Sequence, residues 1–534
     1  MSPKSAPKRS GLSGFLIFLS LLLLSTITGH PQSKGGNASQ QNPTTQRNPG
    51  QVYESSGVLK TTTRLVILDV VAKDNNDHSV KDLKADEFTV LEEGQEQKIT
   101  DMSFHEPPPR LKTVAPPPKG ILTNVPEYRD NSCLNIILLD ALNTDFSNRA
   151  YAQDMLIKYM ASEPAIQPTA VLALDGKLRL LHDFTTDTRV LKDVLAHYMP
   201  KGVFTHIDTV YASASRMGVS GSFQNSDLGR DRTLSAMNYL AHALGGYHGR
   251  KNLIWVSDGF PINLVPDAST GSFGTSDYSA LVEKVADALL TAQVAVYPID
   301  AAGTGRGGNF SSHNTMTGMA ERTGGKTYFN RNDIEVGVQT SIDDGSTYYT
   351  LEYYPQNKNW DDRFRRIKVQ VSRPGVKLRY REGYYAVSPE ASRRADLTDV
   401  RDDFSHAMDI NSPTSTAVLF QAAAVPPAGK TPNTVVVNFA IDPHTITFET
   451  GEDGLQHATI NCVAWAYPQK GDPVRSEGSS NAALKPEVYK QVMSSYYPCQ
   501  RTLELKSGHY TLRLGVLDRI TNLIGTTTTQ LTVP

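Results

Sequence analysis

The chain has 534 residues, a length that corresponds to three or four domains at about 150 residues each. Hydrophobic residues make up 39% of the chain, which suits folded globular domains and excludes wholesale disorder. Lys and Arg number 53 against 55 Asp and Glu, and this balance argues against a nucleic-acid binder, which usually carries a basic excess. The cysteine count of three excludes a disulfide-dense scaffold and a Cys-rich zinc or iron–sulfur protein.

The first thirty residues have the pattern of a secretory signal peptide. Lys4, Lys8 and Arg9 precede an apolar run over residues 15–24, which is shorter than the about 20 residues of a membrane-spanning helix. We therefore expect an exported protein, secreted or held in the periplasm or cell envelope. The alternative is a retained N-terminal anchor, which would give membrane contact only if the segment stays uncleaved. Residues 31–58 are rich in Gly, Ser, Asn, Gln and Pro and predict a disordered leader.

Two short β-rich segments flank a longer stretch of alternating strands and helices. Residues 59–105 and 341–388 predict strands, and each is too short for a core of its own. We expect them to pair into one β-sandwich, and a separate module for each is the alternative. Residues 106–130 predict a Pro-rich linker. Residues 131–340 alternate continuous apolar strands with amphipathic helices, the pattern of a doubly wound, mostly parallel sheet, with an inserted loop over 200–230.

The C-terminal quarter of the chain returns to β character. Residues 389–414 predict a linker, and residues 415–534 predict a β-rich domain. Cys462 and Cys499 lie in this domain, and in an oxidising compartment they would pair, which on the chain-entropy model is worth roughly 3–4 kcal/mol. Cys133 opens the first α/β strand and is expected to be a buried thiol. The expected fold class is therefore α/β plus all-β.

Carboxylates stand at the ends of two predicted strands of the α/β domain. Asp140 and Asp258 each follow an apolar strand, and in open α/β sheets ligands bind beyond the carboxyl ends of the strands. Thr144 follows Asp140 by four residues, and Thr233 stands just before the predicted helix that leads to the strand of Asp258. Carboxylate and hydroxyl oxygens suit Mg²⁺, which prefers oxygen ligands and keeps several waters. The sequence thus predicts a cation site here, and the alternative is that each Asp only caps a helix or turn.

Three segments of this domain carry a resemblance to a known family. They are Asp140-Ala-Leu-Asn-Thr144, Gly249-Arg-Lys-Asn-Leu-Ile-Trp-Val-Ser-Asp-Gly-Phe-Pro261 and Val296-Tyr-Pro-Ile-Asp300. They resemble a von Willebrand factor type A domain. With the flanking segments 86–94, 366–371 and 381–385, the chain more narrowly resembles the exported VWFA-related family of Acidobacteria. The resemblance covers residues 60–390 and implies the von Willebrand factor A-like form of the doubly wound sheet.

The resemblance also implies a metal-ion-dependent adhesion site, whose first motif is Asp-x-Ser-x-Ser. Asp140 and Thr144 match its first and last positions, whereas Leu142 replaces the middle Ser, and the adjacent Asn143 is a candidate to compensate. Asp258 matches the Asp of the Asp-Gly strand end. Mg²⁺ is the implied cation, with Mn²⁺ or Ca²⁺ as alternatives.

The site also needs an isolated Thr. Thr233 is the choice for this ligand, and Thr205 and Thr209 are its rivals. In such a site an acidic side chain of a partner protein fills the open position of the cation, which gives binding without turnover.

The sequence therefore predicts an exported, adhesion-type protein-binding module that is not an enzyme and contacts no nucleic acid. One alternative is a structural component of the cell envelope with a non-functional metal site. A less favoured alternative is a metal-dependent hydrolase that uses Asp140 or Asp258 as its base.

Overall fold

The structure of this chain is a computed structural model, and the first residue that it describes is residue 65. It describes residues 65–108, 111–129, 133–162, 167–200, 222–259, 278–304, 310–386, 403–425 and 433–534, with only the backbone for 222–231, 278–280 and 310–312. The predicted signal peptide and leader lie outside these ranges, as do Thr205 and Thr209. Within these ranges no helix is both long and apolar enough to cross a membrane.

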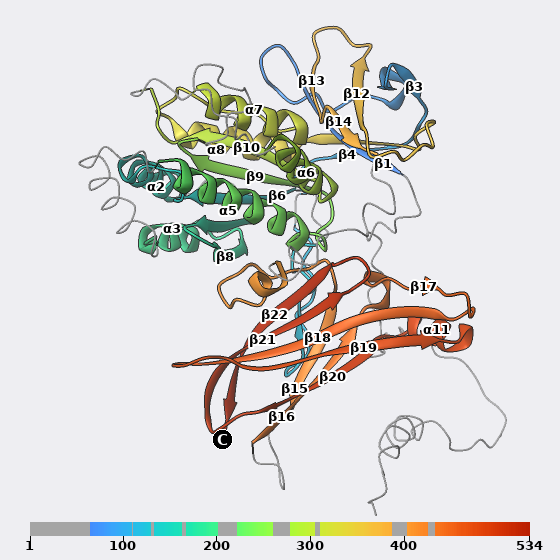
Figure 1. The fold of residues 1–534 in the computed structure, drawn as a ribbon. Helices are drawn as coiled ribbons and strands as arrows, with labels where there is room; N and C mark the ends of the chain where they lie inside the picture. The colour runs from blue at the N-terminus through green and yellow to red at the C-terminus, as the bar shows by residue number, and fades with distance from the viewer. Residues whose placement is uncertain are drawn as a thin grey trace, which may run out of the picture. The chain divides into compact units, whose positions relative to one another are not determined.

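A five-stranded sheet forms the centre of the α/β region (Figure 1). Its strands run in the order β10-β9-β6-β7-β8, and all neighbours are parallel except the hairpin pair β7 and β8. The strands are β6 (Cys133–Asp140), β7 (Thr169–Leu174), β8 (Leu178–Thr185), β9 (Arg250–Ser257) and β10 (Val294–Asp300). Every residue of the four parallel strands is buried, because helices cover both faces of the sheet.

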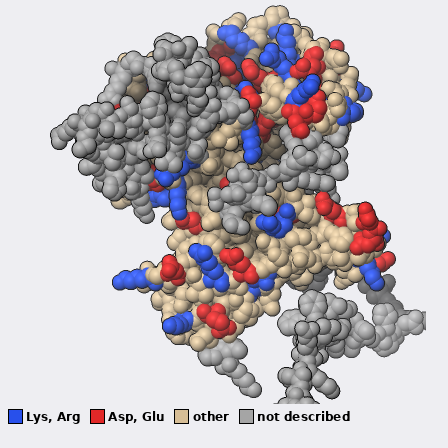
Figure 2. Space-filling model, in the orientation of Figure 1, with Lys and Arg blue, Asp and Glu red and all other residues tan. Residues whose placement is uncertain are grey.

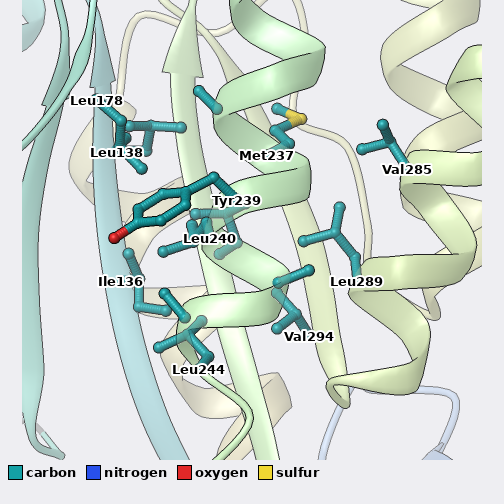
Figure 3. Packing of buried hydrophobic residues seen from close by; sticks show 14 of the residues in the cluster. Ile136, Leu138, Leu178, Met237, Tyr239, Leu240, Leu244, Val285, Leu289 and Val294 are labelled. Carbon is teal, nitrogen blue, oxygen red and sulfur yellow. The ribbon is translucent and has the colours of Figure 1, made fainter. Parts of the chain in front are cut away.

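Alternate residues of each strand enter two different cores. On one face, Ile136 and Leu138 pack with Leu240 and Leu289, as Figure 3 shows. On the other face, Ile137 belongs to the second core. The helices of the first core are α5 (Ser222–Ala243), α6 (Tyr278–Thr291) and α7 (Phe310–Thr323), and those of the second are α2 (Phe146–Ala161), α3 (Thr188–His197) and α8 (Ile334–Ser346). This doubly wound arrangement confirms the predicted fold class.

Three local features differ from the sequence-based expectations. Helix α5 begins at Ser222, inside the stretch expected to be a loop over 200–230. Helix α8 was not expected, although Ile334, Val338 and Ile342 recur at helical spacing and enter the core together. The apolar residues of 326–329 suit a short strand by their sequence, but they form only a single bridge, between Tyr328 and Ile299 of β10.

Strands from both sides of the α/β region combine into one sandwich. One sheet has the order β13-β1-β11-β4 and the other β14-β12-β2-β3, so each sheet contains strands from before and after the inserted α/β region. The strands are β1 (Val66–Lys73), β2 (Phe88–Glu92), β3 (Gln95–Gln97), β4 (Ile99–His105), β11 (Tyr348–Tyr353), β12 (Phe364–Val371), β13 (Lys377–Arg379) and β14 (Gly383–Tyr385). Glu92 ties the sheets together, because its carboxylate accepts from Tyr353 at 2.8 Å and pairs with Arg365 at 3.2 Å. Pairing is required because neither segment has enough residues for a core alone.

The C-terminal β region is a second sandwich. Its sheets have the orders β20-β16-β15-β5 and β17-β18-β21-β22, with β19 paired to β18. The strands are β5 (Leu122–Thr123), β15 (Phe420–Val425), β16 (Thr434–Ile441), β17 (Glu449–Thr450), β18 (Gln456–Pro468), β19 (Val474–Leu484), β20 (Tyr497–Glu504), β21 (Gly508–Asp518) and β22 (Ile524–Val533), with a helix α11 (Pro486–Met493). Strand β5 comes from the segment expected to be only a linker. Its neighbour Asn124 donates to the carbonyls of Ser415 and Val418, so this segment also completes the C-terminal sheet.

Hydrogen bonds also join the α/β region to the segment that leads into the C-terminal sandwich. The Tyr239 hydroxyl on α5 donates to the Pro413 carbonyl at 3.0 Å, and the Gly246 N–H donates to the Thr416 hydroxyl at 3.0 Å. A Cβ at Gly246 would lie 2.3 Å from the Thr416 carbonyl oxygen, so this close approach requires glycine. The limits of the expected domains stay predictions.

A disulfide joins the two sheets of the C-terminal sandwich. It links Cys462 on β18 to Cys499 on β20 across a separation of 37 residues, while Cys133 is buried and free. We expect Cys462→Ser/Cys499→Ser to lower the free energy of unfolding by about 3 kcal/mol, because the unfolded chain gains the entropy of the opened loop. Urea unfolding with and without reductant measures this loss. Cys133→Ala is the control, and it should respond to reductant as the wild type does; an unchanged midpoint in the double variant would contradict the expectation.

Asp287 on α6 is a half-buried carboxyl near the first sandwich, and it accepts from the backbone N–H of Tyr385 in β14. Burial raises the pKa of Asp287 to about 7, although Arg381 and Arg322 act in the opposite direction. Because the folded state holds this proton more tightly than the unfolded state, the contribution of Asp287 to the free energy of unfolding should fall as pH rises from about 4 to 7. The fall is at most about 4 kcal/mol.

Asp287→Asn should remove this fall, leaving the variant equal to the wild type near pH 4 and more stable above pH 7. Urea midpoints across this pH range make the measurement. Asp193→Asn, on an exposed position of α3, is the matched control and should keep the wild-type profile. An Asp287→Asn variant with the same pH profile as the wild type would contradict the prediction.

Candidate functional site

The two predicted strand-end carboxylates lie at the same edge of the central sheet. Asp140 is the last residue of β6, and Asp258 directly follows β9, which pairs with β6 in parallel. Strand β7 lies on the other side of β6. After β6 the chain continues towards β7, whereas after β9 it continues towards β10, in the opposite direction along the sheet. The carboxyl edge between β6 and β9 is therefore the topological switch point, where open α/β sheets bind ligands.

The Asp140 carboxylate is buried and fully engaged. Its Oδ1 accepts from the backbone N–H groups of Leu142 at 3.2 Å and Asn143 at 3.0 Å. Its Oδ2 accepts from the Asn143 side chain at 2.8 Å, from Trp255 Nε1 at 3.0 Å and from Ser257 Oγ at 3.0 Å. A carboxylate offers about four lone-pair positions, so these donors saturate it. Burial raises the pKa of Asp140, and the donors oppose that rise.

Asn143 connects Asp140 to Thr233. Its side-chain nitrogen donates to Thr233 Oγ1 at 2.8 Å as well as to Asp140. The preceding Leu142, which stands where the family motif has a Ser, packs against the first core and not towards the polar edge. At this position the chain therefore makes an apolar contact with the core where the motif has a hydroxyl.

Thr144 and Asp258 form the second half of the cluster. The backbone N–H of Asp258 donates to Thr144 Oγ1 at 3.2 Å. Asp258 Oδ2 accepts from the backbone N–H of Asp145 and from Asn148 Nδ2, each at 2.8 Å, so this carboxylate lies at the N-terminus of α2. Negative charge is favoured there by the helix dipole. Burial nevertheless raises the pKa of Asp258 to about 6, and the nearby carboxylates of Asp145 and Asp300 add to the rise.

The structure thus brings all five predicted residues into one cluster, and their role as metal ligands stays a prediction. Sequence reasoning missed Trp255 and Ser257, which hold Asp140. Strand alternation offered a signal, because residues 255 and 257 lie on one face of β9. It also missed the pair of Asp300 and His313, whose Oδ2 and Nε2 are 3.1 Å apart at the end of β10.

The oxygen atoms of the cluster suit a hard cation as ligands, but the space between Asp140 and Thr233 is already occupied. Asp140, Thr144, Thr233 and Asp258 supply the oxygen atoms that Mg²⁺ prefers. However, the position between Asp140 and Thr233 is filled by the Asn143 side-chain nitrogen, which is a hydrogen-bond donor and cannot ligate a cation. Among the residues that the structure describes, no group of three or more His, Cys, Asp or Glu side chains could hold a metal ion. As these side chains lie, the place between Asp140 and Thr233 does not fit a resident cation, whereas the buried Oδ1 of Asp258 has no hydrogen-bond partner among the described residues.

The chain is similar to known proteins in structure but not in sequence. No protein-family model matches the chain, and no curated protein matches it. The chain is similar in structure to BatB from Bacteroides thetaiotaomicron, with 13% identity over 40% of this chain and 98% of that one and a TM-score of 0.23. It is also similar to the vWF domain of the type V pili tip protein Mfa5 from Porphyromonas gingivalis, with 12% identity over 40% and 96% and a TM-score of 0.20.

A third match covers more of this chain. It is a von Willebrand factor type A protein from Catenulispora acidiphila, at 8% identity over 82% of this chain and 74% of that one, with a TM-score of 0.22. These TM-scores are low, and no role for any residue of this chain follows from them.

The two carboxylates should differ in what their removal costs. Asp140→Ala leaves several buried donors without an acceptor, and we expect it to lower the free energy of unfolding by about 3–5 kcal/mol. Asp258→Ala releases one backbone N–H and one amide near solvent, and we expect a loss of about 1 kcal/mol. Urea unfolding of both variants gives the comparison, in which each serves as the control for the other. Equal losses would mean that the Asp140 donors find other partners.

Proposed function

We propose that this chain is an exported protein-binding module whose binding surface is the carboxyl edge of β6 and β9. The observation that carries the proposal is the clustering of Asp140, Asn143, Thr144, Thr233 and Asp258 at the topological switch point of the sheet. This is the position where α/β sheets of this type bind their ligands. Loops and helix ends at such an edge carry binding residues on a rigid scaffold.

An exposed aromatic side chain beside the cluster supports a protein partner. Phe146, the first residue of α2, is 75% exposed, and the Arg149 guanidinium lies 5.4 Å from the centre of its ring. Tyr151, five residues further along α2, is 38% exposed, and its hydroxyl donates to the Asn332 carbonyl. Aromatic and Arg side chains are enriched among the residues that contribute most to protein interfaces. An aromatic group next to a polar cluster suits an interface with an apolar anchor and oriented hydrogen bonds.

The chemistry of the partner depends on whether a cation is bound. Without one, this edge offers the half-buried Asp258 carboxylate and the Phe146 ring, which suit a partner with hydrogen-bond donors beside an apolar group. The predicted Mg²⁺, or Mn²⁺ or Ca²⁺, would instead be held by Asp140, Thr144, Thr233 and Asp258. It would accept an acidic side chain of the partner. Since Asn143 lies between two of these ligands, we favour the first mode.

Export is supported by the C-terminal sandwich. A disulfide between Cys462 and Cys499 suits a secreted, periplasmic or envelope location, where thiols become oxidised. A nucleic-acid partner is disfavoured by the charge balance of the chain, and Figure 2 shows basic and acidic side chains interspersed on the face that it draws. The envelope-scaffold alternative differs from the proposal only in making no use of this edge.

Partner capture by variants of the immobilised full chain tests the proposed surface. Phe146→Ser and Asp258→Asn should each weaken the capture of the same envelope protein by about tenfold, because each removes a central contact. Val488→Ser, on the exposed face of α11, removes a similar apolar side chain elsewhere and should leave capture unchanged. If both Phe146→Ser and Asp258→Asn capture the partner as strongly as the wild type does, the proposal is contradicted. Turnover of an ester or peptide panel that is lost in Asp258→Asn, at the carboxylate whose removal costs less stability, would favour the hydrolase alternative.

A further inference from the structure

One side chain of the cluster has a position that the predicted cation site cannot accommodate. Asn143 Nδ2 lies 2.8 Å from Asp140 Oδ2 and 2.8 Å from Thr233 Oγ1. A side-chain amide nitrogen carries two N–H donors, and these two contacts occupy both. The nitrogen therefore bridges a carboxylate and a hydroxyl, as a cation would if both were its ligands.

The orientation of this amide follows from its neighbour. An ionised carboxylate can only accept hydrogen bonds, so the amide must present its nitrogen to Asp140, because its oxygen would face another oxygen. The backbone N–H of Asn143 donates to the other carboxylate oxygen of Asp140 at 3.0 Å. One residue thus holds both oxygens of the same buried carboxylate.

The surrounding contacts show why the amide is needed at this position. Asp140 is 2% exposed, and a buried carboxylate is costly unless donors or a cation compensate its charge. The residue before Asn143 cannot help with its side chain, since Leu142 packs against the first core. Charge-assisted hydrogen bonds to a carboxylate are among the strongest in proteins, so an amide and two further side-chain donors can together replace an ion.

We propose that the side-chain amide of Asn143 takes the place of the divalent cation at this edge, so that the chain folds and keeps the edge in shape without a metal ion. The inference extends the proposed function, because it makes the binding surface insensitive to chelators. It concerns the chain alone and requires no partner. If the unfolding experiments overturn this inference, the capture experiment still tests the proposed function. If the capture experiment overturns the proposed function, the inference about Asn143 still stands.

Thermal unfolding of the full chain in EDTA and in millimolar Mg²⁺ or Mn²⁺ tests the inference. The wild-type midpoint should be the same in all three media, because a ligand raises the midpoint only if the native state binds it. Asn143→Ala should unfold several degrees lower in EDTA. The cations should raise its midpoint in a concentration-dependent way, since the position of the amide is then open. Asn143→Asp keeps the shape but replaces the donor with a second carboxylate, and it should depend on the cation more strongly.

Asn148→Ala is the matched control. It removes an amide that donates to Asp258 at 2.8 Å and leaves the Asn143 amide in place between Asp140 and Thr233, so it should gain no response to cations. A wild-type midpoint that rises with Mg²⁺ or falls with EDTA would overturn the inference, because a cation would then be resident. The inference would also be overturned if both Asn143 variants lose stability without regaining it in Mg²⁺ or Mn²⁺. If neither variant folds, Mn²⁺ binding to the wild type measured by electron paramagnetic resonance decides the question, and tight binding would contradict it.

Discussion

The arrangement of the candidate site depends on the buried carboxylate of Asp140. It stands at the end of a strand whose every residue is buried, so its charge has to be compensated inside the protein. Backbone N–H groups of the following loop compensate one oxygen, and side chains of Asn143, Trp255 and Ser257 compensate the other. This requirement fixes the path of the loop and orients Asn143. The same requirement places the donors Trp255 and Ser257 of β9 next to the end of β6.

The same compensation links the site to the rest of the α/β region. The loop held by Asp140 leads directly into α2, whose N-terminus holds Asp258 through Asp145 and Asn148. Asn143 also donates to Thr233 on α5, so the cluster includes a residue of a helix that covers the opposite face of the sheet from α2. The edge is therefore rigid where the polar groups meet, and Phe146 projects from it into solvent. A rigid polar cluster beside an exposed aromatic ring is the basis for proposing a binding role.

The periodicity of the sequence predicted much of the fold. Continuous apolar strands alternating with amphipathic helices predicted a doubly wound sheet, because a sheet covered on both faces needs apolar residues at every strand position. Helix α8 escaped prediction although Ile334, Val338 and Ile342 are correctly spaced for a helix. Strand β5 could not have been predicted, since Leu122–Thr123 has only two residues and exists because β15 supplies its pairing partner. Short strands depend on tertiary pairing and not on local propensity.

For the site, the sequence by itself determined which polar residues end the central strands, because the positions of Asp140 and Asp258 follow from the lengths of the apolar runs before them. It left the direction of each side chain open. Only the tertiary structure decided that Leu142 packs into the core and that the Asn143 amide bridges Asp140 to Thr233, because the residues of the first core and Thr233 of α5 are distant in the chain. Whether a polar cluster is completed by an ion or by a protein donor is decided by such distant contacts, and a sequence motif does not contain them.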